Sequence, residues 1–354
     1  MRIYRHLIIF LYRHIRENII KLKERQRIWH TRVLLQPEDC RREHEPKHDI
    51  LDAPRLTDDE RMHIIEAKER ETGELPPELR EQARTELREE PALREQALAQ
   101  MRHFIEKHPA IKRCRTDTPF LLRFLRTKKY SIPQACSMLE RYLTIRQMYP
   151  QWFQKLDPLD PKIAAVIDAG YLVPLPKRDS EGRRVVLSCM GRFDPHQFDS
   201  CVMARVHSMI VELLLDEPRS QLLGYTHVND EAGMQMPHVS LWSLTDVRIM
   251  LNCIQNSTPM RHKRTHFVNI PAYGFHRASD ELVKHVDSAI LPKEYGGTVP
   301  LRDMIEELKR NLLKQRDALL SLDDMCVDLH ALEKNDLTQD IHSTAGSFRK
   351  LELD

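Results

Sequence analysis

The sequence predicts an α/β protein in which a helical N-terminal subdomain precedes a domain built on a mainly parallel sheet. Three observations lead to this prediction. Past Trp152, short β-like runs alternate with helical runs, whereas the apolar spacing before it is helical. Only 10 of the 354 residues are glycine, which argues against a loop-rich all-β fold. The 41% hydrophobic content suits a globular core in one large domain or two ordinary ones.

Charge and composition divide the chain into four segments. The first fifty residues hold 12 Lys and Arg against 7 Asp and Glu, and the next fifty hold 8 against 14. A basic leader and linker (1–55) therefore precedes a helical subdomain (56–150), and an α/β domain (151–300) precedes a C-terminal helix and tail (301–354).

The leader has the pattern of an amphipathic helix, with its apolar residues three or four positions apart. These residues are Ile8, Leu11, Ile15, Ile19 and Leu22. Three interpretations stay open: a helix on a membrane surface, an Arg-rich mitochondrial-type presequence, or a helix that packs on the body.

Helix starts in the subdomain 56–150 are marked by capping residues and prolines. They are expected at Thr57 with Glu60, at Pro77, and at Ser131 with Pro133. The run Thr118–Thr127 is short and strongly apolar, and it carries Arg123 and Arg126. We therefore expect this subdomain to be all-α.

The α/β domain is expected to contain four strands and three helices. The strands are Tyr171–Leu175, Arg184–Met190, Leu222–Val228 and Thr265–Ile270, and the helices are Ser200–Leu215, Leu244–Asn256 and Ser279–Ile290. One further helix is predicted over residues 301–322, where leucines recur on one side. Its stripe is read as core packing, with a short coiled coil as the alternative.

Composition excludes several classes of protein. Lys and Arg number 55 against 53 Asp and Glu, so the large basic excess of a nucleic-acid binder is missing. The seven cysteines are scattered and never form a C-x-x-C pair, which favours reduced thiols in a cytosolic protein. The longest apolar run near the start, Leu7–Tyr12, falls far short of the roughly 20 residues that cross a bilayer.

Catalytic and metal motifs are also missing, so we expect neither an enzyme nor a metal site. No phosphate-binding glycine loop, H-E-x-x-H or G-x-S-x-G occurs. His262 and His266 are four apart, but they run into a predicted strand, where that spacing does not form a helix face. Asp194, Asp230 and Glu231 follow predicted strands, as acids do in α/β enzymes, yet they also suit turns.

Short sequence motifs distinguish between the remaining classes of α/β protein. The sequence resembles the CRAL-TRIO lipid-binding family, most closely the branch of alpha-tocopherol transfer protein and retinaldehyde-binding protein. The resemblance covers about 220 residues, from near Leu75 to Thr298. It rests on TPFLLRFLRTK (118–128), GRRVVLSCMGRFDP (182–195), THFVNIP (265–271) and LPKEYGGT (291–298).

The resemblance implies an N-terminal helical subdomain beside an α/β domain with a deep apolar cavity. Such proteins carry a water-insoluble tocopherol-, retinoid- or phospholipid-like ligand there, without a cofactor, and exchange it at membranes. Alternate residues of the runs 185–189 and 223–227, and one face of the helix 200–215, are candidates to line the cavity. These candidates are Val185, Leu187, Met203, Val206, Ile210, Leu223 and Tyr225. Each is equally well an ordinary core residue.

Basic residues provide the candidate membrane site. The run Arg261–Arg264 precedes the last predicted strand, and in the tocopherol-transfer branch this loop helps to bind phosphoinositide headgroups. Arg261, Lys263 and Arg264 are therefore candidates, and Arg123 and Arg126 would extend the patch. A basic loop that only increases solubility is the alternative. The resemblance implies a cytoplasmic monomer that associates peripherally with membranes.

The chain departs from the family in one segment. Only 21 residues separate Asn269 from Leu291, and family members have a longer stretch here. The missing part corresponds to the helical lid over the cavity and one strand. We therefore hold two hypotheses: a carrier of a hydrophobic ligand, and a peripheral membrane adaptor that has lost its cargo.

Overall fold

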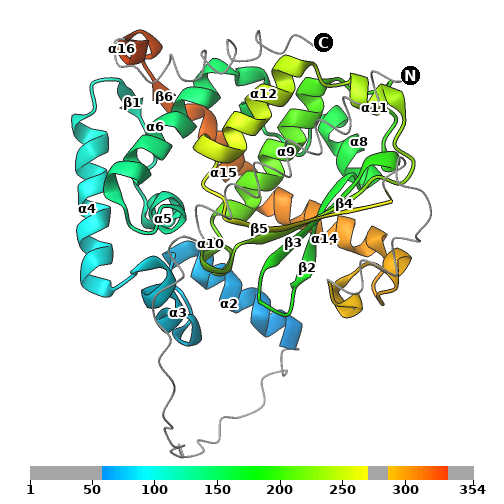
Figure 1. Cartoon of the computed structure of the whole chain (residues 1–354), viewed down its shortest axis with the longest axis horizontal. Coiled ribbons are helices and arrows are strands. Elements are labelled where there is room, and N and C mark those ends of the chain that lie inside the picture. The colour runs from blue at the N-terminus through cyan, green and yellow to red at the C-terminus, as the bar shows by residue number, and fades with distance from the viewer. Residues whose placement is uncertain (1–57, 270–285, 334–354) are drawn as a thin grey trace, which may run out of the picture. The chain divides into compact units, whose positions relative to one another are not determined.

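The computed structural model describes residues 58–269 and 286–333, shown in Figure 1. The chain divides into two compact units, Met1–His63 and Ile64–Asp354, and the features below lie in the second, apart from the first six residues of α2 (Asp58–Thr72). The predicted leader and the capping box at Thr57 lie outside the described residues.

The N-terminal part of this unit is mainly helical, as predicted, but it is not all-α, because Ile111–Arg113 form a short strand that pairs with Cys326–Val327. Its elements are α2 (Asp58–Thr72), α3 (Pro77–Leu87), α4 (Pro91–Lys107), β1 (Ile111–Arg113), α5 (Thr118–Thr127), α6 (Ile132–Met148) and α7 (Pro150–Phe153). Proline stands in the first turn of α3, α4, α5 and α6, where its missing N–H has no helical partner to lose. The apolar faces of α4 and α6, including Leu98, Met101, Leu139 and Tyr142, are buried together in one core.

The α/β part follows with helices around one sheet (Figure 1). Its elements are α8 (Pro161–Ala169), β2 (Leu172–Arg178), β3 (Arg184–Cys189), α9 (Ser200–Leu215), α10 (Pro218–Leu223), β4 (Tyr225–Asp230), α11 (Met236–Ser240), α12 (Leu244–Asn252) and β5 (His262–Val268). A π-helical turn, Cys253–Ser257, continues α12. The last elements are α14 (Leu301–Lys314), α15 (Arg316–Ser321), β6 (Cys326–Val327) and α16 (Leu329–Glu333).

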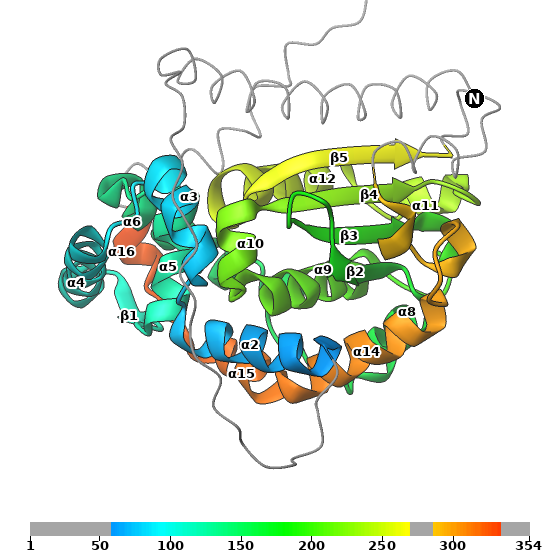
Figure 2. The same ribbon diagram turned by 90° about the horizontal axis from the view of Figure 1, so that it is seen from below.

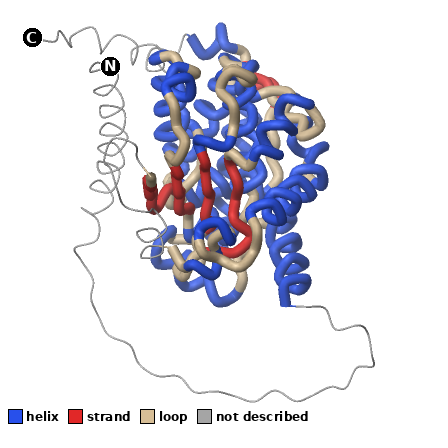
Figure 3. The backbone as a smooth tube through the Cα atoms, turned by 90° about the vertical axis from the view of Figure 1, so that its right-hand side faces the viewer, coloured by secondary structure: helices blue, strands red, loops and turns tan. Residues whose placement is uncertain are grey.

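The four-stranded sheet has the order β2-β3-β4-β5. The pair β2–β3 is antiparallel, and β3–β4 and β4–β5 are parallel. Figures 2 and 3 show the strands side by side, with helices packed around them. Among the described residues β5 pairs with β4 alone, while β1 and β6 form a separate antiparallel ribbon. The predicted fold class, a helical N-terminal region and a largely parallel α/β domain, is confirmed.

Several element boundaries differ from the predicted ones; for example, β2 extends to Arg178 and α12 ends at Asn252. Leu222 belongs to α10 and not to a strand, because Gly224 ends that helix with φ of 88° and β4 starts at Tyr225. A Cβ at Gly224 would lie 2.5 Å from the carbonyl oxygen of Arg261, so only glycine fits there. The predicted helix over 301–322 is two helices, α14 and α15, joined at Gln315. Finally, β5 begins at His262, so most of the basic run is strand.

The predicted loss of a lid helix and a strand concerns residues 270–290. Most of this segment lies outside the described residues, so the loss stays a prediction; its last residues, Ser288–Ile290, form a 3-10 turn. No helix in the described ranges is both long and apolar enough to span a membrane.

Candidate functional site

One face of the sheet is incompletely covered. A central parallel strand is normally buried on both faces. In β4 the residues Thr226, Val228 and Asp230 are buried on one face, whereas His227 and Asn229 on the other are only half-buried. The register places Thr265 and Phe267 of β5 directly beside them, and these are also half-buried. We call these four residues the half-covered face.

Helix α9 lies against this side of the sheet. The Tyr225 hydroxyl, on the same face as His227, donates to the Leu214 carbonyl of α9 at 2.9 Å. His207 and Val211 lie one turn apart on α9 and are half-buried, in contrast to the buried Met203 and Ile210. The half-covered face is therefore adjacent to the stripe of α9 that carries His207 and Val211, and this stripe is also incompletely packed.

Helix α12 is also short of packing partners. None of its nine residues is buried, although Val247, Ile249, Met250 and Leu251 are apolar. Trp242, just before α12, has its ring 6.5 Å from that of His207 on α9. The N-terminal end of α12 thus lies near the half-covered face.

The predicted cavity residues do not share one surface. Val185 and Leu187 pair with Thr226 and Val228, so they lie on the fully covered face of the sheet. Tyr225 is on the opposite face, where it is buried under α9. Met203, Val206 and Ile210 are also buried, and Leu223 is half-buried in α10. Their role as cavity-lining residues stays a prediction.

Two shallow surface hollows occur elsewhere. The larger, of about 660 Å³, is lined by α4 and the residues that follow it, and the second lies between α4 and α6. Neither includes a predicted cavity residue.

The predicted basic patch is only partly at the surface. Arg123 and Arg126 are buried: Arg123 pairs with Glu212 at 2.7 Å, and Arg126 pairs with Glu89 at 2.6 Å. The interpretation that they extend a membrane-facing patch is corrected, because their guanidinium groups are enclosed and neutralised.

Of the run 261–264, two residues keep accessible side chains. Arg261 is held by the Leu222 carbonyl and by Glu86 at 3.2 Å, with 10% of its side chain exposed. Lys263 also pairs with Glu86, at 3.6 Å, and is 25% exposed; Arg264 pairs with Glu181 at 2.5 Å and is 47% exposed.

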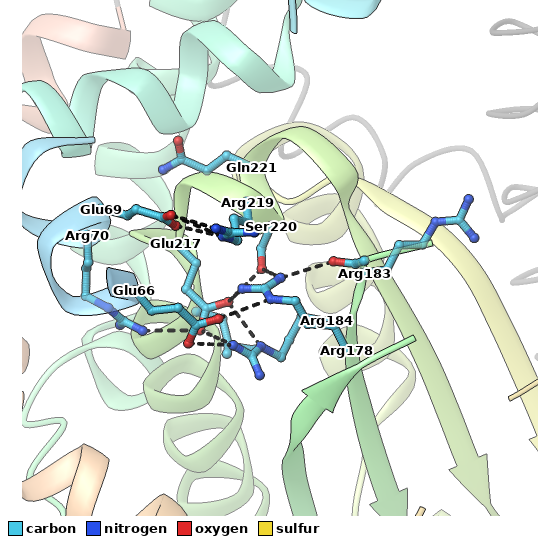
Figure 4. Close-up of polar contacts among 12 residues, drawn as sticks. Glu66, Glu69, Arg70, Arg178, Arg183, Arg184, Glu217, Arg219, Ser220 and Gln221 are labelled. Atoms are coloured by element: carbon cyan, nitrogen blue, oxygen red, sulfur yellow. Dashed lines mark hydrogen bonds and ion pairs between the residues drawn. The ribbon is translucent and has the colours of Figure 1, made fainter. Parts of the chain in front are cut away.

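A buried ionic cluster joins α2, α10 and the sheet (Figure 4). Glu217, at the start of α10, accepts from Arg70, Arg178 and Arg184 at 3.1–3.2 Å and from the Ser220 hydroxyl at 2.6 Å. Burial alone raises the pKa of Glu217, but the charges of the three arginines outweigh it and lower this pKa to about 2. The carboxylate is therefore ionised and structural. The sequence carried no signal for this cluster, whose members are far apart in the chain.

The acids considered for catalysis have local partners. Asp194 is exposed and accepts from the backbone N–H of His196 in a turn. Asp230, at the end of β4, accepts from the Tyr295 hydroxyl and from Asn269 at 2.6 Å. His262 and His266 do not converge: His262 contacts His227, and His266 pairs with Val228 on the other face.

Fold and site together define a mixed α/β protein with a helical N-terminal region and an incompletely covered sheet face. Residues 168–274 match the family model described as the CRAL/TRIO domain, and residues 90–163 match the model described as Pinta-like, UBA domain. Clavesin-1 of Pongo abelii is 29% identical over 252 residues, covering 65% of this chain and 71% of that protein. Clavesin-2 of Homo sapiens is 27% identical over 252 residues, covering 65% and 77%.

These matches support the assignment of the chain to the CRAL-TRIO domain family. The match over residues 168–274 includes β2, β3, β4 and β5, and the one over 90–163 includes α4, α5 and α6. The finer resemblance, to the tocopherol-transfer and retinaldehyde-binding branch, stays a prediction.

Proposed function

We propose that this protein binds a hydrophobic small molecule against the half-covered face and transfers it between membranes. The observation that carries the proposal is the half-burial of His227 and Asn229 on a central strand whose other face is fully buried. Family membership supports it, because the ligand-binding domain that the resemblance implies corresponds to these strands.

The energetic argument concerns apolar surface. Phe267, Val211 and four apolar residues of α12 (Val247, Ile249, Met250 and Leu251) are half-buried and leave hydrocarbon in contact with water. Covering such surface contributes roughly 25 cal/mol per Å². An apolar ligand in this position would supply the covering layer that the described residues lack, which favours binding of a hydrophobic molecule over a polar one.

Native mass spectrometry of the full chain, incubated with a total cellular lipid extract, tests the proposal. We expect a discrete 1:1 adduct of one lipid class, whose mass identifies the ligand. A clean unliganded mass from a protein that circular dichroism shows to be folded contradicts the carrier function.

Filling the space beside the half-covered face is expected to reduce binding. Val211→Trp places an indole on the half-packed stripe of α9, one turn from His207. We expect the affinity for the adduct-forming lipid to fall about tenfold or more, which is roughly 1.4 kcal/mol. The measurement is a lipid titration followed by native mass spectrometry.

Leu313→Trp is the matched control, since Leu313 is 49% exposed on α14. It should bind as the wild type does. Equal affinity of Val211→Trp and wild type, with both proteins folded, would place the ligand elsewhere in the molecule.

We also propose docking to phosphoinositide-containing membranes through Lys263 and Arg264. Their accessible side chains lie on β5, which pairs with β4 alone among the described residues, near one end of the half-covered face. Each Lys or Arg near an anionic leaflet contributes about 1 kcal/mol. The two are partly neutralised by Glu86 and Glu181, so docking requires these ion pairs to loosen at the membrane.

Neutralising this pair is expected to weaken membrane binding. Lys263→Gln with Arg264→Gln should lower co-sedimentation with phosphoinositide vesicles about tenfold. Arg302→Gln with Arg310→Gln, exposed on α14, should leave it unchanged. Vesicle binding that depends on Lys263 and Arg264, in a protein that forms no lipid adduct, would favour the membrane adaptor over the carrier.

A further inference from the structure

A pair of histidines lies at the half-covered face. His227 of β4 and His262 of β5 approach with 3.0 Å between Nε2 of the first and Nδ1 of the second, and their ring centroids are 4.9 Å apart. The other ring nitrogen of His262, Nε2, is buried and has no hydrogen-bond partner among the described residues.

Both rings are uncharged at neutral pH. Burial, reinforced by the neighbouring His262 and His207, lowers the pKa of His227 to about 3. Burial alone lowers the pKa of His262 to about 4. The pair therefore offers hydrogen bonds but no positive charge.

A neutral imidazole has one donor and one acceptor nitrogen. If Nδ1 of His262 donates to His227, then Nε2 of His262 is an acceptor. If His227 donates to Nδ1 of His262, then Nε2 of His262 carries the proton and is a donor. In either tautomer the pair leaves one buried hydrogen-bonding atom unused. Leaving such an atom unpaired is unfavourable, so a ligand group that can pair with it gains affinity.

We propose that His262 Nε2 binds a neutral hydroxyl group at the polar end of a hydrophobic ligand. The inference rests on the proposed carrier function and narrows its ligand to an alcohol or phenol. A hydroxyl suits the site because it both donates and accepts, so it pairs with either tautomer. A carboxylate or phosphate suits it poorly, because a buried anion needs a cationic partner and these imidazoles are neutral.

The residues around His262 are consistent with the polar end of a ligand at this position. His207 of α9 contacts the Tyr171 hydroxyl at 3.3 Å and the Met203 carbonyl at 3.0 Å, so its two ring nitrogens are already engaged. Asn229 pairs with the Ser188 hydroxyl at 2.7 Å on the same face. Among these polar groups, His262 Nε2 is the buried atom for which the described residues supply no hydrogen-bond partner.

The test compares two probes that differ in one group. Full-length protein is loaded with Nile red, an uncharged apolar dye, and titrated with 1-hexadecanol or with 1-fluorohexadecane, which has the same chain and no hydroxyl. We expect the alcohol to displace the dye about five- to tenfold more effectively, the range of one buried hydrogen bond.

Variants assign the difference to one atom. His262→Phe keeps a ring and removes both nitrogens, so the preference should fall to parity while the affinity for 1-fluorohexadecane is kept. His262→Gln restores a polar group and should recover part of the preference. His196→Phe, at an exposed turn residue, is the control and should behave as the wild type does.

The outcomes separate this inference from the carrier proposal. Equal displacement by both probes from wild-type protein overturns the hydroxyl assignment, even where His262→Phe does not fold, and leaves the carrier function standing. A preference that survives in His262→Phe overturns the role of His262 alone. Absence of dye binding, together with no adduct from the lipid extract, overturns both.

Discussion

Replacing Glu217 with glutamine is expected to lower the free energy of unfolding by about 3–5 kcal/mol. The side chain is buried between Arg70, Arg178 and Arg184, and the substitution keeps its shape but removes its charge. The three guanidinium groups would then lose the carboxylate that they share, and Glu66, which pairs with Arg178 and Arg184, would be left to compensate them (Figure 4). Urea denaturation followed by circular dichroism measures the change.

The pH dependence of this variant gives a second measurement. Glu217 has a folded-state pKa of about 2 and an ordinary value of 4.5. Its stabilising contribution is therefore fully present above about pH 4.5 and is lost as the pH falls toward 2. The stability difference between wild type and Glu217→Gln should accordingly be largest near neutral pH and shrink in acid.

Glu78→Gln is the matched control. Glu78 pairs with Arg219 at 3.3 Å, but its side chain is 61% exposed. Exposed pairs contribute little, so we expect a change within about 1 kcal/mol. A Glu217→Gln protein as stable as this control would mean that Glu66 or water, and not Glu217, compensates the charges of the three arginines.

Local pattern predicts some helices well and misses others, such as α8 and α11, while part of α10 is predicted as strand. The segment Ser200–Leu215 was predicted from its apolar spacing, and α9 has these bounds, with Asp199 capping its start by accepting from the Val202 N–H. The apolar run Thr118–Thr127, expected only to lie in a helical region, is α5. The break at Gln315 escaped prediction because neither glycine nor proline marks it.

Which face of a strand is covered could not be predicted. Alternate residues of Val185–Cys189 point to opposite faces of the sheet. Because β3 is buried on both faces, every residue is apolar or paired, and the two faces look alike in the sequence. Val185 and Leu187 lie on the face opposite Tyr225, and the sequence does not reveal this because the register between strands is a long-range property. Half-burial at His227 and Asn229 depends on packing that a single sequence does not encode locally.

The arginines of α5 show the same limit. A run with two arginines among apolar residues is equally consistent with a basic surface and with buried ion pairs. The partners that decide, Glu89, Glu212 and Asp216, are distant in sequence. For this reason the predicted membrane role of Arg123 and Arg126 is wrong. Lys263 and Arg264, in contrast, have side chains that are accessible to a membrane surface.

Arg126→Met is expected to lower the free energy of unfolding by about 3–5 kcal/mol and to leave vesicle binding by the folded fraction unchanged. Arg126 is fully buried and donates to Glu89 at 2.6 and 2.8 Å, to Gln221 at 2.7 Å and to the Gly73 carbonyl at 2.9 Å. Methionine fills part of the volume but leaves Glu89 without its counter-charge.

The double variant Arg126→Met with Glu89→Met separates charge from packing. Removing both charges avoids the uncompensated carboxylate, so we expect it to recover part of the stability that the single variant loses. Arg84→Met, which breaks an exposed pair with Glu81, is the control and should change stability by less than about 1 kcal/mol. An Arg126→Met protein that keeps wild-type stability but loses binding to phosphoinositide vesicles would mean that Arg126 contacts the membrane, which contradicts its burial. Loss of stability with unchanged vesicle binding identifies Arg126 as a buried structural contact, which pairs with Glu89 inside the helical subdomain and hydrogen-bonds to Gln221 of α10.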